Sequence, residues 1–131
     1  MIVLDASVLS NVVGDDGPDG MLARERITHE SAIAVPDLAD VETVSVLRRR
    51  WLDQTLTARR FSAAVEDLIS LPFSRYPAIH LLHRVYALRA NVTAYDAVYV
   101  ALAEALGCAL VTADRRLARA PGLRCQIEVI S

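Results

Sequence analysis

The sequence contains no lysine, and all 14 of its basic residues are arginine. This absence excludes a Walker-type nucleotide site, which needs a Gly-Lys pair, and no Gly-x-Gly-x-x-Gly run is present either. Phosphorelay receivers and haloacid-dehalogenase-like phosphatases also place acids at strand ends, but both typically use a lysine near the phosphoryl group. The phosphatase pattern also requires a second aspartate where Ser7 stands.

Long hydrophobic runs are missing too, although 53% of the chain is hydrophobic and its mean hydropathy is +0.31. Uncharged apolar runs, such as residues 97–103, are far shorter than the ~18 residues that a membrane span requires. The first residues carry no basic group, and Asp5 comes too early for a secretory signal. We therefore expect a cytoplasmic protein without a membrane segment.

Aromatic residues and cysteines are scarce. Aromatics make up 5% of the chain, which argues against a broad base-stacking surface for single strands. The two cysteines, Cys108 and Cys125, are expected to be buried thiols in a reducing compartment, and a disulfide would require that their strands be neighbours. The net charge of −2 does not by itself indicate a nucleic-acid-binding protein, although arginine suits bidentate phosphate contacts.

Short apolar segments alternate with helical patterns along all 131 residues, which predicts a single α/β domain with a mainly parallel sheet and helices on both faces. The expected strands cover residues 2–4, 32–35, 71–76 at an edge, 108–112 and 124–130. The expected helices cover residues 6–13, 21–30, 37–52, 58–71, 77–90, 93–106 and a short segment ending at 118 or 119. Residues 14–20 form a break rich in glycine and aspartate, in which Asp15 and Asp16 are expected to be solvated.

Asp96 interrupts the most apolar of these helices. At 3.6 residues per turn it shares a stripe with Val100 and Ala103, so its carboxylate should face the interior or a cleft. An ionised group in such a place needs a partner, a cation or a raised pKa. The alternative is a structural role, in which Thr93 caps the helix and Asp96 complements the helix dipole.

Other acids are expected at the same rim. Asp5 and Asp114 each follow a predicted strand, and ligands of parallel sheets bind at the carboxyl ends of the strands. Glu42 interrupts an apolar helix face. Asp5 and Asp114 could each act only as helix N-caps, but acids that converge from separate elements repel one another unless they share protons or bind cations. Oxygen ligands without histidine or cysteine favour Mg²⁺ or Mn²⁺. Such ions suit phosphoryl chemistry, since one can activate water and another can stabilise the leaving oxygen.

Four segments together resemble PIN-domain proteins of the VapC toxin family: residues 2–7, the helix around Glu42, residues 95–104 and residues 110–117. The resemblance covers nearly the whole chain and implies a PIN-like three-layer α/β/α sandwich over residues 1–131. It also implies a metal-dependent endoribonuclease, the toxin of a bacterial type II toxin–antitoxin pair. Asp5, Glu42, Asp96 and Asp114 match the family's acidic quartet, which would hold one or two ions.

The resemblance further implies RNA as substrate, a homodimer, and inhibition by a small VapB-type antitoxin. Ser7 and Thr112 match polar positions beside the quartet, where they would either hydrogen-bond carboxylates or only cap helices. Arg115 and Arg116 follow Asp114 directly and could contact RNA phosphates, the antitoxin or only solvent. His80 and His83 are expected to have surface or packing roles. The competing function is a non-catalytic interaction module that binds an antitoxin-like partner.

Overall fold

The computed structural model describes residues 1–131 as a parallel five-stranded sheet with helices packed around it. The strands are short and lie in the order β3-β2-β1-β4-β5. Their bounds are β1 Ile2–Leu4, β2 Ile33–Pro36, β3 Ser74–Tyr76, β4 Ala109–Thr112 and β5 Ile127–Val129. Every neighbouring pair is parallel, and β3 is an edge strand, as the sequence predicted.

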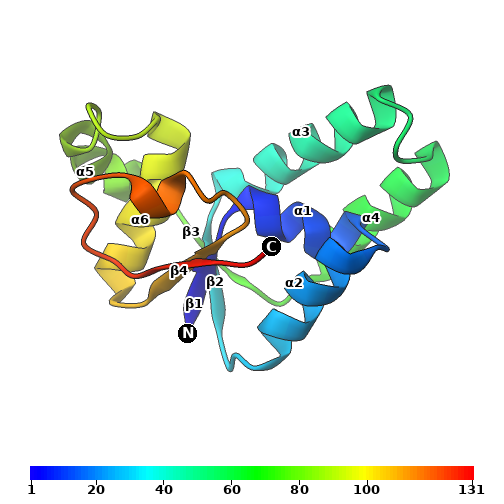
Figure 1. The fold of residues 1–131 in the computed structure, drawn as a ribbon, viewed down its shortest axis with the longest axis horizontal. Coiled ribbons are helices and arrows are strands. Elements are labelled where there is room, and N and C mark those ends of the chain that lie inside the picture. Colours follow the sequence, from blue (N-terminus) through cyan, green and yellow to red (C-terminus); the bar gives the residue numbers. More distant parts are fainter.

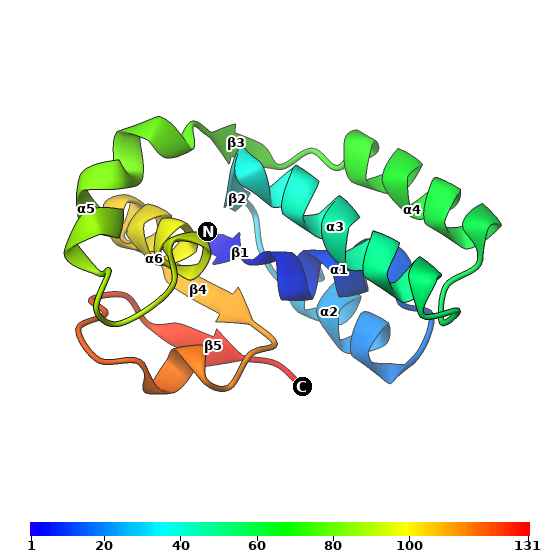
Figure 2. The ribbon, with the colours of Figure 1, turned by 90° about the horizontal axis from the view of Figure 1, so that it is seen from above.

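Helices cover the sheet in two groups (Figures 1 and 2). One group contains α1 Ala6–Gly14, α2 Pro18–Thr28, α3 Leu38–Leu52 and α4 Ala58–Ser70. The other contains the 3-10 helix η1 Ala78–Leu81, α5 Leu82–Ala87 and α6 Ala94–Leu106, while the 3-10 helix η2 Leu117–Arg119 lies near β5. The α/β sandwich expected from the sequence is confirmed. No helix has the length and apolar character needed to cross a membrane.

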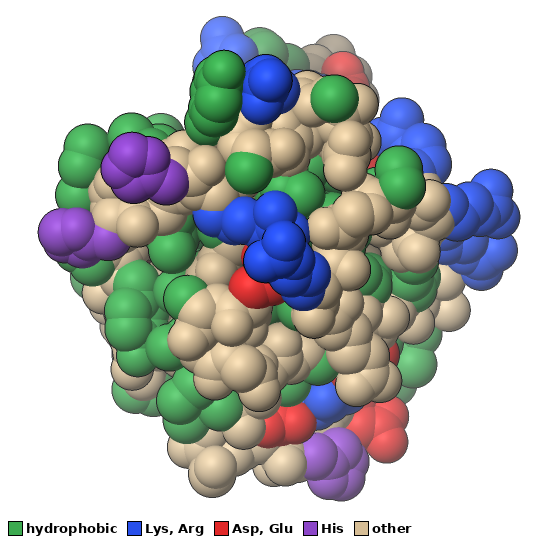
Figure 3. Space-filling model, turned by 90° about the vertical axis from the view of Figure 1, so that its left-hand side faces the viewer, with side chains coloured by type: hydrophobic (Ala, Val, Ile, Leu, Met, Phe, Trp, Pro, Cys, Tyr) green, Lys and Arg blue, Asp and Glu red, His purple; other side chains and the backbone are tan.

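The core forms where the first and fourth strands meet α1 and α6. The side chains of β1 are fully buried, and α6 is buried from Ala97 through Ala103. This explains why the sequence of α6 is apolar on all sides. Side chains on the surface are mixed, and basic groups gather at the centre of the face that includes α5 (Figure 3).

Local signals in the sequence define several helix ends. Thr57 and Thr93 accept hydrogen bonds from the backbone N–H groups of Arg60 and Asp96, as N-caps do. Gly107 ends α6 in the left-handed conformation, with φ of 65°, which glycine adopts without steric cost.

Tertiary contacts move several predicted boundaries. The helix expected over residues 77–90 is wrong in extent, because it begins as a 3-10 helix and ends at Ala87. Leu88 is buried there, and the Asn91 side chain donates to the carbonyl of Pro121 at 2.8 Å. The last strand is shorter than expected, since the Arg124 N–H donates to Glu104 at 2.7 Å instead of joining the sheet.

The break at residues 14–20 is also shorter than predicted. Helix α2 begins at Pro18. Proline has no N–H group, and the N–H at the first position of a helix has no partner within the helix in any case. The Asp15 carboxylate accepts hydrogen bonds from the N–H groups of Gly17 and Gly20, at 2.7 and 3.1 Å. Asp16 forms an ion pair with Arg60 at 3.0 Å. The expectation that Asp15 and Asp16 are simply solvated is therefore wrong.

Candidate active site

The strand order places two of the predicted acids side by side. The chain leaves β1 in one direction toward β2 and returns to the other side of β1 as β4, so the order reverses between β1 and β4. Ligands of open α/β sheets bind at such a reversal, outside the carboxyl ends of the strands. Asp5 directly follows β1, and Asp114 comes two residues after β4. The fold thus puts both acids at the sheet edge where ligands of open α/β sheets bind.

Two helices bring the other acids to the same edge. Helix α6 packs against β1, β2 and β4, and its first turn carries Asp96. Glu42 lies in α3 and accepts a hydrogen bond from the Tyr99 hydroxyl at 2.9 Å, which ties α3 to α6. Tyr99 is 1% exposed, so this contact is fixed by the core.

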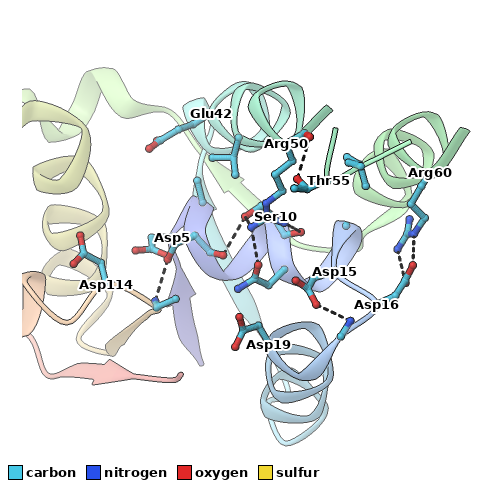
Figure 4. A pocket seen from close by; sticks show the side chains of 18 of the residues that line it. Asp5, Ser10, Asp15, Asp16, Asp19, Glu42, Arg50, Thr55, Arg60 and Asp114 are labelled. Atoms are coloured by element: carbon cyan, nitrogen blue, oxygen red, sulfur yellow. Dashed lines mark hydrogen bonds and ion pairs between the residues drawn. The ribbon is translucent and has the colours of Figure 1, made fainter. Parts of the chain in front are cut away.

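All four acids line one cavity of about 920 Å³ (Figure 4). Asp5, Glu42 and Asp114 lie on one side of the close-up, and Thr55 and Arg60 lie on the other. Arg50 lines the space between them, where it donates to the Asn11 side chain at 2.8 Å. The convergence expected from the sequence is present in the tertiary structure.

The hydroxyls of Ser7 and Thr112 connect Asp5 to the segment that carries Asp114. Each hydroxyl donates to one carboxylate oxygen of Asp5. Each also accepts a backbone N–H at 3.0 Å, from Ala113 in the case of Ser7 and from Asp114 in the case of Thr112. Because each hydroxyl proton has to point at Asp5, the two residues fix the position of that carboxylate.

Capping and site roles coexist at Asp5. Its side chain accepts the N–H of Val8 at 3.2 Å and so caps α1. Asp114 is not the cap of the following helix, because Arg116 occupies that position in η2. The Asp114 side chain instead accepts the N–H of Arg116 at 2.9 Å and closes a local turn.

Three of the acids share an unfavourable environment for ionisation. Burial raises the pKa of Asp5 above its ordinary value, and its hydrogen bonds offset this only in part. Burial also raises the pKa of Glu42 and of Asp96, and neighbouring carboxylates add to both shifts. No ion pair with an arginine relieves any of these three acids. A bound cation would favour their ionised forms.

Asp114 differs from the other three acids. Its carboxylate accepts hydrogen bonds from the Arg116 guanidinium at 3.2 and 3.1 Å. These hydrogen bonds hold the pKa of Asp114 below its ordinary value. The cation that the other acids lack is thus supplied to Asp114 by an arginine two residues away.

Comparison with known proteins identifies the family. The PIN domain model matches residues 2–123 of this chain. A VapC ribonuclease of Mycobacterium bovis is 44% identical over 99% of this chain and 98% of its own length. This chain is a member of the VapC family of PIN-domain proteins.

Solved structures agree on the fold. The Mycobacterium tuberculosis toxin VapC20, which cleaves the sarcin-ricin loop, superimposes with a TM-score of 0.72 at 15% identity, over 91% of this chain and 94% of its own. VapBC2 from Rickettsia felis, bound to a DNA fragment from its promoter, gives a TM-score of 0.69 at 15% identity over the whole of both chains. Because these identities are low, the two matches establish only the fold of this VapC-family protein.

The acids of this VapC-family protein have the donor chemistry that suits a hard divalent cation. All are carboxylates, and no histidine or cysteine lines the cavity. As they stand, no three acidic, histidine or cysteine side chains surround one point closely enough to hold an ion. Glu42 is directed to Tyr99 and Asp114 to Arg116, so rotation of these two side chains would be needed to bring more oxygens together.

The sequence did not reveal Tyr99 as a part of this VapC site. In the sequence Tyr99 lies among apolar residues of this helix, although its position three residues after Asp96 puts both on neighbouring parts of one helix surface. Its hydroxyl is a polar atom in a buried setting, which requires a partner, and Glu42 is that partner. Arg50 was also missed as a lining residue, since it stands in a run of three arginines that gives no sign of which one turns inward.

The remaining candidate residues lie outside the cavity. Arg115 lies outside it and donates to the Ser131 hydroxyl at 3.1 Å. His80 and His83 are exposed on η1 and α5. Both cysteines are free thiols that lie before β4 and β5, not within them as expected. The Cys108 N–H donates to Ala103 at 3.0 Å and closes the end of α6, so this residue does not begin the strand.

Proposed function

We propose that this protein is an endoribonuclease that hydrolyses RNA phosphodiester bonds and acts in the cytoplasm as the toxin of a type II toxin–antitoxin pair. The observation that carries the proposal is the cavity at the strand-order reversal, lined by Asp5, Glu42, Asp96 and Asp114. The identity of 44% to a VapC ribonuclease over nearly the full length of both chains supports it.

We propose Mg²⁺, or Mn²⁺ in its place, as the cofactor, in one or two ions held by these four carboxylates. When bound, such ions supply a water nucleophile near neutral pH and stabilise charge on the leaving oxygen. The chain's own contribution is to place the carboxylates. Ser7 and Thr112 hold both oxygens of Asp5, while the buried Tyr99 holds Glu42 against α6.

The natural partner is proposed to be a VapB-like antitoxin. VapBC structures, such as the one from Rickettsia felis, share the fold of this chain over its whole length. The test is co-expression with the product of a short adjacent reading frame. Co-purification and suppression of RNA cleavage are expected, and cleavage that continues within a stable complex would contradict an inhibitory role.

A homodimer is proposed on the basis of an exposed apolar surface between α3 and α4. Val41 and Ile69 are 74% and 69% exposed there and line a shallow cavity with Val44, Val65 and Leu68. Light scattering should give the mass of two chains. A Val41→Asp variant that remains folded should then shift toward the monomer.

The decisive experiment is cleavage of a labelled RNA with Mg²⁺ or Mn²⁺. We expect cleavage that stops with a chelator, products with a 5′-phosphate and a 3′-hydroxyl, and loss of cleavage in Asp5→Asn. Asp53→Asn is the matched control, since Asp53 lies at the exposed end of α3 and outside the cavity. Cleavage that survives both the chelator and Asp5→Asn would reject the metal nuclease. Absence of cleavage by the folded wild type, together with tight antitoxin binding, would favour the non-catalytic interaction module.

A further inference from the structure

A second groove adjoins the main cavity and shares two of its acids. Asp96 and Asp114 line both spaces, and the second groove has a volume of about 480 Å³. Arg89, Asn91 and Arg116 form its other polar lining, together with Thr93. A strand that passed over Asp96 and Asp114 would therefore continue into this groove.

The two spaces carry opposite surroundings beyond the shared acids. The main cavity continues to Asp15, Asp16 and Asp19. Its Arg60 is already paired with Asp16, and its Arg50 donates to the Asn11 side chain. In the second groove the only acids are the shared ones, and both arginines are exposed. Repulsion from carboxylates is thus weaker in the second groove, which is the better place for a phosphate.

Arg89 has no carboxylate partner. Its guanidinium lies 4.1 Å from the centre of the Tyr86 ring, and it donates to the Tyr86 carbonyl at 3.0 Å. These contacts orient the side chain but leave its charge without a counterion among the acids of the chain. A guanidinium held in this way can donate two N–H hydrogen bonds to the oxygens of a phosphate in a bidentate contact.

Arg116 is held only by its pair with Asp114. The side chain is 89% exposed, and its Nη2 lies 3.1 Å from Oδ2 of Asp114. Ion pairs in contact with water are weak, so this one exchanges readily for a stronger partner. A divalent cation on Asp114 would compete with the guanidinium for the same two oxygens.

We propose that Arg116 is an exchangeable residue, which pairs with Asp114 in the free protein and, once released, binds an RNA phosphate in the second groove beside Arg89. The inference rests on the proposed ribonuclease function and extends it to the path of the substrate strand. It assigns two separate effects to one side chain: competition with the cation at Asp114 and attraction of the phosphate next to the cleaved bond.

Arg115→Ala is the matched control for Arg116→Ala. The two residues are adjacent and exposed and carry the same charge, but Arg115 lines neither groove and contacts Ser131 instead of Asp114. A general loss of positive charge affects both variants alike. Only the specific roles proposed here separate them. Circular dichroism checks that both variants fold.

The first measurement is the binding of Mn²⁺ without RNA, by calorimetry. Arg116→Ala should bind Mn²⁺ about two- to five-fold more tightly than Arg115→Ala, because it removes a competitor of the strength of an exposed ion pair. The second is the KM for a single-stranded RNA at several salt concentrations. Arg116→Ala should raise KM with little change in kcat, and should reduce the slope of log KM against log salt by about 0.7, which is one phosphate contact.

Equal behaviour of Arg116→Ala and Arg115→Ala in both measurements would overturn the proposal. So would an unchanged KM combined with weakened antitoxin binding, which would assign Arg116 to the protein partner. Failure of the wild type to bind or cleave RNA is a different result, since it would overturn the ribonuclease function itself. Arg116→Lys, which keeps the charge but not the forked contact, should retain the salt slope and still bind Mn²⁺ more tightly than the wild type.

Discussion

The two ends of α6 carry acids with opposite fates. Asp96, in the first turn, has no arginine partner, and burial together with the Asp114 carboxylate raises its pKa. Glu104, near the last turn, is also partly buried, and burial alone would raise its pKa. Hydrogen bonds from the Arg84 guanidinium at 2.6 Å and the Arg124 N–H at 2.7 Å instead lower it below the ordinary value.

This difference separates a structural carboxylate from a proposed site carboxylate within one helix. At Glu104 the chain supplies its own cation, so nothing further is required. At Asp96 the chain supplies no directly paired cation: Arg116 acts on it only from a distance, and the Asp114 carboxylate lies nearby. A bound cation would favour the ionised form of such a carboxylate. The predictions below test this contrast, beginning with the largest effect.

Asp96→Asn should abolish most of the RNA cleavage, by about 100-fold or more, because loss of a ligand is expected to exceed the 10- to 100-fold effect of a residue behind the ligands. The fold should persist, since the Thr93 hydroxyl caps α6 by accepting the backbone N–H of residue 96, which the substitution leaves in place. Glu104→Gln is the control on the same helix and should keep its kcat. Equal loss in the two variants would erase the functional difference between the ends of α6.

Thr112→Val should reduce cleavage by about 10- to 100-fold, as expected for a residue that orients a ligand. The change removes a hydroxyl that is fully buried and joins Asp5 to the N–H of Asp114, so both groups lose a partner. Steady-state kinetics with Mn²⁺ should show the effect mainly in kcat. Thr28→Val, on the exposed side of α2, should leave the rate unchanged; a parallel loss there would point to general destabilisation.

Glu104→Gln should instead affect stability, by about 1–3 kcal/mol in the free energy of unfolding, the cost of losing hydrogen bonds to a charged group. Its side chain is 12% exposed and pairs with both Arg84 and the Arg124 backbone, which anchors the segment before β5. Chemical denaturation measures the change. Asp96→Asn should be neutral or stabilising in the same experiment, and the comparison fails if it is the more destabilised variant.

The smallest effect is expected in the pH dependence of unfolding, where the two acids should have opposite signs. The pKa of Asp96 is raised above 3.8, so its ionisation opposes folding, and the lost stability returns as the pH falls through the raised pKa. The pKa of Glu104 is lowered below 4.5, so it stabilises the fold above 4.5 and loses this contribution as the pH falls through the lowered value.

Denaturation from about pH 7 down to about pH 3, below the ordinary pKa of a glutamate, tests these signs. As the pH falls, the stability gained by Asp96→Asn relative to the wild type should disappear. The stability lost by Glu104→Gln relative to the wild type should decrease over the same range. Saturating Mn²⁺ should abolish the advantage of Asp96→Asn near neutral pH, since the cation then favours the ionised carboxylate. The same pH slope in both variants would show that the two environments do not differ electrostatically.

Local sequence was sufficient for the presence of each strand and for the positions of the acids at strand ends, but not for every element boundary. Each expected strand is present, the Thr93 cap acts as predicted, and the acids after β1 and β4 lie at the carboxyl edge of the sheet. Helix caps and strand-end positions depend on neighbours along the chain, so a sequence can specify them without knowledge of the fold.

Only the tertiary structure decided how each carboxylate is balanced. Asp96 and Glu104 look alike in the sequence, as acids on one apolar helix. Nothing local shows that Arg84 forms an ion pair with Glu104, whereas no arginine forms one with Asp96. Nothing local shows the hydrogen bond between Tyr99 and Glu42 either, or the pairing of Asp16 with Arg60, which is 44 residues away in the sequence. The sequence by itself determined which acids could lie at the same edge of the sheet. The packing of distant elements determined which of these acids have no paired arginine, because charge interactions depend on distance in space and on burial.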